Sequence, residues 1–186
     1  MSGTALTFAE LQFVISLVPD SPIDVVAQLE LDPEHASALL ASGLASLLVR
    51  EACDVGQDGV ELRGDVAEIT ESFGAAVECY RISITTETDM KIWQIFASNS
   101  RRLLVTPLGY GVFQCMPMQI EPRLDLQLGD LLEASLDDDS HSIILEKMGR
   151  DSSTGVILER SASDWIDRDH ADAPLSLRDH LISVTM

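Results

Sequence analysis

The densest group of potential metal ligands in the sequence is the run from Asp137 to Asp139, with His141 close behind it. Clustered carboxylates suit calcium, but an EF-hand loop also needs glycine at its sixth position and glutamate at its twelfth. Counted from Asp137, those positions hold Ser142 and Met148. We therefore interpret the run as a solvated connection and predict that it binds no metal.

A second stretch with the residue types of a ligand loop extends from Asp151 to Gly155 and contains serine and threonine. A phosphate-binding loop of the Gly-x-x-x-x-Gly-Lys-Ser/Thr type uses its lysine to contact a phosphate. This stretch has neither that spacing nor a lysine. An ordinary hairpin loop explains it better.

Histidine follows aspartate at Asp169-His170 and at Asp179-His180, which could suggest a proton relay. Adjacent residues on a helix do not face each other, and no Gly-x-Ser-x-Gly segment supplies a nucleophile. The four histidines and three cysteines show no pair at zinc-ligand spacing. The sequence thus predicts no catalytic residue, no cofactor and no metal, and we do not expect an enzyme. A carboxylate pair for acid–base catalysis stays open, because spacing does not show which acids meet in space.

The cysteines are Cys53, Cys79 and Cys115, an odd number at wide spacings. A free cysteine behaves as a small apolar residue. We predict three buried free thiols.

Charge is the unusual feature of the composition. The 31 acidic and 12 basic residues give a formal net charge of −19, while 46% of the residues are hydrophobic, as in ordinary globular proteins. A field of that sign repels phosphate backbones and anionic lipid. We expect no nucleic-acid partner and no membrane partner. No apolar run approaches a membrane-spanning length, so we expect a cytoplasmic protein.

The segments that must position any functional residue are organised around residues 76–118. This region contains β-branched and aromatic runs that alternate with a period of two, separated by short polar turns. Tyr80, Ile82 and Ile84 share one face, and Arg81 and Ser83 share the other. The pattern predicts an antiparallel meander, with turns at 86–89, 98–100 and 107–109.

Helices are predicted on either side of the meander. Thr7 and Glu10 fit a capping box at the start of the first helix, and two further helices start near Ser21-Pro22 and Asp32-Pro33. Gly43 is a candidate C-cap, to be followed by a strand at 44–50 and a return strand at 60–62.

Three helices followed by a hairpin is the order of a winged helix, whose third helix would read DNA. That helix offers no lysine or arginine for phosphate contacts.

The later segments follow the same logic. Asp65 is expected to cap a helix through Phe73, and Asp125 or Asp130 to cap a leucine-rich helix ending near 136, which would cover one face of the sheet. We divide the chain into an α+β core, 1–136, and an acidic extension, 137–186, that packs on the core. In the extension, 142–146 and 155–159 are expected to pair as a hairpin, and Leu177, Leu181 and Ile182 recur at helical spacing.

Trp93, Ile95 and Trp165 are the candidate interface residues. Trp93 and Ile95 share one face of their strand, while Met90, Ile92 and Phe96 occupy the other. Both faces of the strand therefore carry apolar side chains. Such a sheet needs helices on both faces or a second chain. Tryptophan is frequent both in cores and at interface hot spots.

A family resemblance rests on the order of these segments. It includes the opening helices, the step at Ala41-Ser42-Gly43-Leu44, the helix at 65–73, the strands around Trp93 and Arg102-Leu103-Leu104-Val105, and the leucine-rich helix. Over residues 6–136 this order resembles the first half of the EspG family, cytosolic actinobacterial chaperones of type VII secretion. The resemblance implies a repeated α+β unit, of which this chain would hold one, and a role in binding secreted proteins. It carries over no binding residue.

The sequence therefore predicts an α+β fold with winged-helix-like N-terminal helices followed by a central antiparallel sheet flanked by helices. The favoured function is a non-enzymatic protein-interaction or chaperone-like protein, acting on a protein partner or through self-association as a homodimer. The alternative is an acidic winged-helix-like regulator whose α+β part senses a ligand or dimerises.

Overall fold

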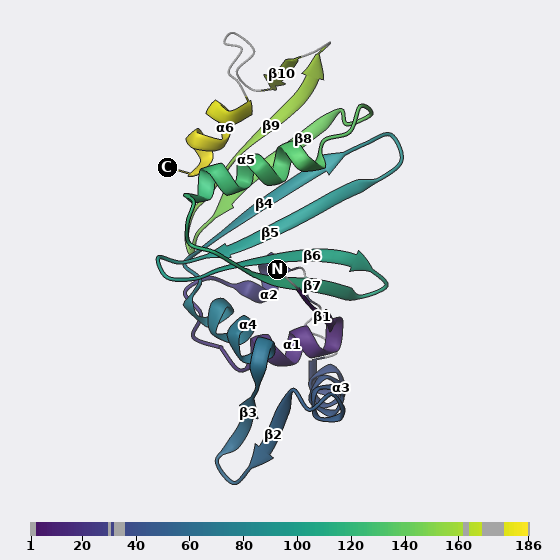
Figure 1. Ribbon diagram of the computed structural model, residues 1–186, viewed down its shortest axis with the longest axis vertical. Helices are drawn as coiled ribbons and strands as arrows, with labels where there is room; N and C mark the ends of the chain where they lie inside the picture. The colour runs from purple at the N-terminus through teal and green to yellow at the C-terminus, as the bar shows by residue number, and fades with distance from the viewer. Residues whose placement is uncertain (1–2, 30, 32–35, 162–163, 169–176, 186) are drawn as a thin grey trace.

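The computed structural model describes residues 3–29, 31, 36–161, 164–168 and 177–185. Its centre is one antiparallel sheet of eight strands in the order β1-β7-β6-β5-β4-β8-β9-β10 (Figure 1). These strands are β1 (Thr4–Thr7), β4 (Glu78–Thr85), β5 (Met90–Ala97), β6 (Arg102–Gly109), β7 (Val112–Met118), β8 (Ser142–Met148), β9 (Ser153–Ser161) and β10 (Asp164–Asp167). A separate hairpin consists of β2 (Cys53–Gly56) and β3 (Gly59–Leu62). The α+β class and the central antiparallel meander are confirmed.

Helices cover parts of both faces of the sheet. They are α1 (Phe8–Ser16), α2 (Val25–Gln28), α3 (Ala36–Val49), α4 (Gly64–Ala75), α5 (Leu124–Ser135) and α6 (Leu177–Thr185). Phe96 and Leu103 point from the sheet into a buried cluster with α1 and α4, whereas Ile95 and Leu104 point into a second cluster with α5 and α6. Because successive strand residues point to opposite faces, the two clusters lie on opposite sides of the sheet.

The start of α1 is the best-predicted boundary in the chain. Thr7 is the N-cap, its hydroxyl accepts from the Glu10 amide at 3.3 Å, and the Glu10 carboxylate accepts from the Thr7 amide at 2.8 Å. The predicted capping box is confirmed. The strand β1 directly before it was not predicted, and it pairs antiparallel with β7 so that Leu6 is fully buried.

The strand predicted at 44–50 is wrong, because α3 continues as a helix through Val49. Gly43 lies inside this helix and is not its C-cap. A Cβ atom at Gly43 would lie 2.1 Å from the backbone oxygen of Ala9 in α1. The glycine therefore permits a close crossing of two helices, which a single sequence cannot distinguish from a helix end.

Two predicted helix caps are also wrong, although both helices exist. α4 begins at Gly64 after Arg63, no side chain caps it, and Asp65 accepts a hydrogen bond from the Thr4 hydroxyl at 2.7 Å. α5 begins at Leu124 after Arg123, and Asp125 forms an ion pair with Arg123 at 3.1 Å. In both cases the incoming backbone starts the helix before the aspartate reaches the cap position. The start predicted near Ser21-Pro22 is wrong too, because α2 begins only at Val25, after its N-cap Asp24.

The last third of the chain adds strands to the same sheet. β8 pairs with β4, and β9 pairs with β8 as the predicted hairpin. β10 pairs with β9 and is the last strand on this side of the sheet. The predicted C-terminal helix is observed as α6, which packs against α5 and β8. The division at 136/137 remains a prediction, as does the winged-helix arrangement of the N-terminal helices.

Candidate functional site

The three predicted interface residues all contact the cluster under α5 and α6. Ile95 is fully buried there, so its side chain is part of the core. Trp93, on the same face of β5, and Trp165, on β10, are partly buried and pack against the same cluster. Only the two tryptophans keep surface that another molecule could touch.

Trp93 borders an opening in the sheet between β5 and β6. The two strands pair only where Gln94–Ala97 face Arg102–Val105, although β5 begins at Met90 and β6 continues to Gly109. Figure 1 shows the two strands diverging away from their connecting turn. The unpaired ends, Asp89–Trp93 and Thr106–Gly109, line a cavity of about 440 Å³. We call these two segments and the space between them the wedge.

Pro107 explains why the ladder stops. Continuing the observed register from Gln94 and Val105 would place Ile92 opposite Pro107. Proline has no N–H to donate, so it is tolerated in a sheet only at edges and irregularities. Residues 107–109 were predicted as a turn, but they continue β6, with a register shift against β7 between Pro107 and Gly109. The proline therefore opens the sheet without ending the strand.

The wedge exposes backbone hydrogen-bonding groups of β5. The Thr86 N–H donates to the Asp89 oxygen at the start of the β4–β5 ladder. Backbone groups alternate between the two neighbours along an antiparallel strand, so those of Lys91 and Trp93 face β4. The N–H and C=O of Ile92 therefore face the wedge, where the described residues provide no strand to pair with them.

Apolar side chains surround this backbone edge. Met90 is 53% exposed and Leu108 is 54% exposed, and Tyr110, at the tip of the β6–β7 hairpin, is fully exposed. A second hollow of about 290 Å³ shares Met90, Ile92 and Pro107 with the wedge, and its wall includes Phe113. The opening thus combines unpaired backbone with apolar surface on both sides.

Acidic residues at the wedge are less engaged than the basic residue beside them. Glu87 and Asp89 are exposed in the β4–β5 turn, and neither forms an ion pair with another described residue. Lys91 contacts the Asp137 carboxylate and donates to the Ser135 carbonyl oxygen at 3.2 Å. The mouth of the wedge is therefore negative.

A polar network fixes the inner end of the second hollow. Arg81 donates to the carbonyl oxygen of Gln28 at 2.7 Å, and the side chain of Gln94 donates to the same oxygen at 2.5 Å. Arg81 also lies 4.0 Å from the Glu146 carboxylate. These contacts tie the end of α2 to β4 and β5, so this part of the sheet is held in place.

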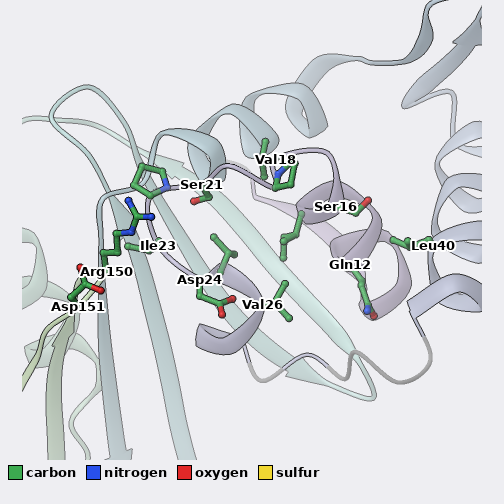
Figure 2. A pocket seen from close by; sticks show the side chains of 14 residues that line it. Gln12, Ser16, Val18, Ser21, Ile23, Asp24, Val26, Leu40, Arg150 and Asp151 are labelled. Carbon is green, nitrogen blue, oxygen red and sulfur yellow. The ribbon is translucent and has the colours of Figure 1, made fainter.

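A larger pocket of about 660 Å³ lies beside α1 and α2 (Figure 2). Ile15, Val18, Ile23, Val26 and Leu40 line it with apolar surface, and Arg150 and Asp151 lie at one end. Its hydroxyl groups already have partners within the fold. Ser16 donates to Phe13 and Ser21 donates to Phe73, while the Asp24 carboxylate caps α2. Gln12, Arg150 and Asp151 are the other polar residues of its lining.

All three cysteines are buried free thiols, as predicted, and burial raises the pKa of Cys79 and of Cys115 to about 12. Over the described part of the chain, no group of three or more histidine, cysteine or acidic residues could hold a metal ion. Asp169-His170 lies outside the described residues, as do Asp32 and Pro33. No described helix is both long and apolar enough to cross a membrane.

Sequence reasoning identified Trp93 but missed the wedge beside it. The opening depends on the register between β5 and β6 and on the direction of backbone groups, which a hydropathy pattern does not contain. The signal that could have found it is Pro107 inside an otherwise strand-like run.

Comparison with known proteins adds a likeness of fold. No protein-family model matches the chain, and no curated protein sequence matches it. A solved structure that resembles it is that of the Mycobacterium tuberculosis type VII secretion system chaperone EspG5 in complex with the PE25–PPE41 dimer. The match has a TM-score of 0.59 and 9% identity, and covers 99% of this chain and 96% of that chain. The likeness of fold therefore extends beyond residues 6–136. Because it also covers 96% of that chain, the expectation that this chain matches only the first half of such a fold is wrong.

Proposed function

We propose that this chain is a non-enzymatic, chaperone-like protein that binds a protein partner in the cytoplasm, in a process related to type VII secretion. The observation that carries the proposal is the fold shared with a secretion chaperone over nearly the whole of both chains. That chaperone is found with a protein dimer, so the shared fold is compatible with holding another polypeptide.

The surface of the chain supports the same function. A gap in the middle of a sheet, lined by exposed Met90 and Leu108, presents apolar surface that a partner could bury. The net charge of −19 would keep a chaperone soluble while such surface is free. Self-association through the same surface is the variant in which the partner is a second copy.

Co-expression with small helical secreted proteins, including any that are encoded beside its gene, tests the proposal. We expect one of them to become soluble only together with this chain and to elute with it at a fixed ratio in size-exclusion chromatography with light scattering. A homodimer of the chain alone would support the self-association variant. The proposal is wrong if the chain elutes as a monomer with none of these proteins, or if it instead binds genomic DNA saturably at modest salt, as the regulator would.

A further inference from the structure

We propose that the wedge binds an extended segment of a protein partner, which adds to the free edge of β5 as a strand. The inference rests on the proposed function and names the part of the chain that would perform it. Strand addition is a recurring mode of peptide recognition, in which main-chain hydrogen bonds supply affinity and alternate side chains supply specificity.

The backbone of β5 provides the first argument. The N–H and C=O of Ile92 face the wedge, where Pro107 cannot donate the hydrogen bond that a continued ladder would require. An incoming strand can pair with both groups of Ile92. The edge is rigid before binding, since the other side of β5 pairs with β4 along its whole length.

The side chains provide the second argument, because they alternate as a strand-binding edge requires. Met90 and Ile92 point to one face, toward the hollow bordered by Phe113, and Trp93 points to the other. An added strand with apolar residues at every second position would lay them beside Met90 and Ile92. Its remaining side chains would lie on the face of Trp93.

The charge around the wedge indicates which polar residues the bound segment should carry. Asp89 lines the wedge and Glu87 lies two residues before it in the β4–β5 turn; both are exposed, whereas Lys91 is engaged by Asp137. On a chain with net charge −19, a segment that alternates apolar with basic residues has the complementary sign. The shape of the opening favours a thin segment over a second copy, because β6 flanks the free edge of β5 (Figure 1).

A synthetic peptide provides the test. The probe is an acetylated and amidated peptide of alternating valine and lysine, about six residues long to match a typical strand. We expect calorimetry to detect its binding to the intact chain. The same peptide with N-methyl groups along one edge should bind about tenfold more weakly, because it cannot complete the hydrogen bonds.

Chain variants locate the site. Pro107→Val restores an N–H opposite Ile92, which allows β6 to pair with β5, and should weaken peptide binding about tenfold while the unfolding midpoint is kept or raised. Glu87→Lys should weaken binding about threefold at low salt, whereas Glu61→Lys, an exposed acid of the separate hairpin, should leave it unchanged.

The outcomes separate this inference from the function on which it rests. Failure of the folded chain to bind the peptide, or equal binding of the N-methylated peptide, overturns strand addition. A partner found by co-expression that binds the Pro107→Val and wild-type chains equally well also overturns it, yet leaves the chaperone function standing. A homodimer that Pro107→Val dissociates would mean that the wedge holds a second copy.

Discussion

Glu10 is a buried residue whose contacts with neighbouring elements depend on its negative charge. Its side chain is fully buried, and it accepts hydrogen bonds from the Thr7 amide, from the Ser46 hydroxyl at 2.7 Å and from Arg50 at 2.9 Å. Burial alone would raise the pKa of Glu10, but these hydrogen bonds and the charge of Arg50 together lower it below 4.5. One carboxylate thereby joins β1, α1 and α3.

The Glu10→Gln substitution should lower the free energy of unfolding by about 2 kcal/mol at pH 7, because hydrogen bonds to a charged group become neutral ones. Urea unfolding measures the change. Glu68→Gln, at an exposed position of α4, is the matched control and should change stability by less than about 0.5 kcal/mol. Similar effects of the two substitutions would contradict a special role for Glu10.

The stabilisation by Glu10 should also depend on pH. Since the pKa is lower in the folded chain than the ordinary value of 4.5, the contribution is fully present above about pH 4.5 and is lost as the pH falls through the folded value. The difference in stability between wild type and Glu10→Gln should therefore shrink below about pH 4.5. A difference that stays constant down to about pH 3 would rule out a charged Glu10 as its source.

For single residues, the sequence predicted contacts between residues that are close along the chain and missed contacts between residues that are far apart along it. The capping box could be predicted because Thr7 and Glu10 are three residues apart. Arg50 and Ser46 could not be assigned to Glu10, because they reach it only after α3 has packed against α1. Asp65 was misassigned for the same reason, since its partner Thr4 lies 61 residues away.

At the scale of helices and strands, the close crossing of α1 and α3 depends on Gly43, because glycine has no side chain. The position where a Cβ atom at Gly43 would lie is only 2.1 Å from the Ala9 oxygen and 2.9 Å from the Cβ of Phe13. Neither atom can move without displacing a helix.

The Gly43→Ala substitution should therefore destabilise the fold by about 2 kcal/mol or more, although alanine is the better helix former by about 1 kcal/mol. Gly129→Ala in α5 is the matched control. There the new Cβ meets only the Leu181 side chain at 3.7 Å, so stability should be unchanged or higher. Thermal unfolding of both variants checks the prediction, and a stabilised Gly43→Ala chain would refute the close crossing.

The elements that were predicted best are those with a strong periodic pattern. The four strands of the meander, the hairpin of β8 and β9, and α5 follow from alternation or helical spacing alone. The extent of each ladder does not follow from the same pattern. Pro107 lies in a strand whose pairing with β5 has already ended, and this depends on register rather than on composition.

At the scale of the whole molecule, the negative charge should oppose folding. Like charges repel in the compact state, and added salt screens them over about 10 Å at an ionic strength of about 0.1 M. The melting temperature should therefore rise by roughly 3 °C between about 20 and about 200 mM NaCl at pH 7, equivalent to about 1 kcal/mol. Near pH 4, where many carboxylates are protonated, the rise should be smaller. A melting temperature that falls with salt at pH 7 would show that ion pairs outweigh the repulsion.

The whole-molecule arrangement was only partly accessible from sequence. Helices on both faces were one of two solutions anticipated for a sheet with apolar residues on each side, and α5 and α6 fill one face while α1 and α4 fill the other. The insertion of β8 beside β4 was not anticipated, because a strand that returns from residue 142 can pair with any free edge.

Amide hydrogen exchange at Ile92 tests the central claim most directly, because it reports both on the open sheet and on the strand that should close it. In the free chain we predict fast exchange at Ile92 between slowly exchanging Lys91 and Trp93, whose amides pair with β4. Bound partner or peptide should slow Ile92 to the level of these neighbours. An Ile92 amide already protected in the free chain, or one that still exchanges rapidly in the complex, would contradict the account.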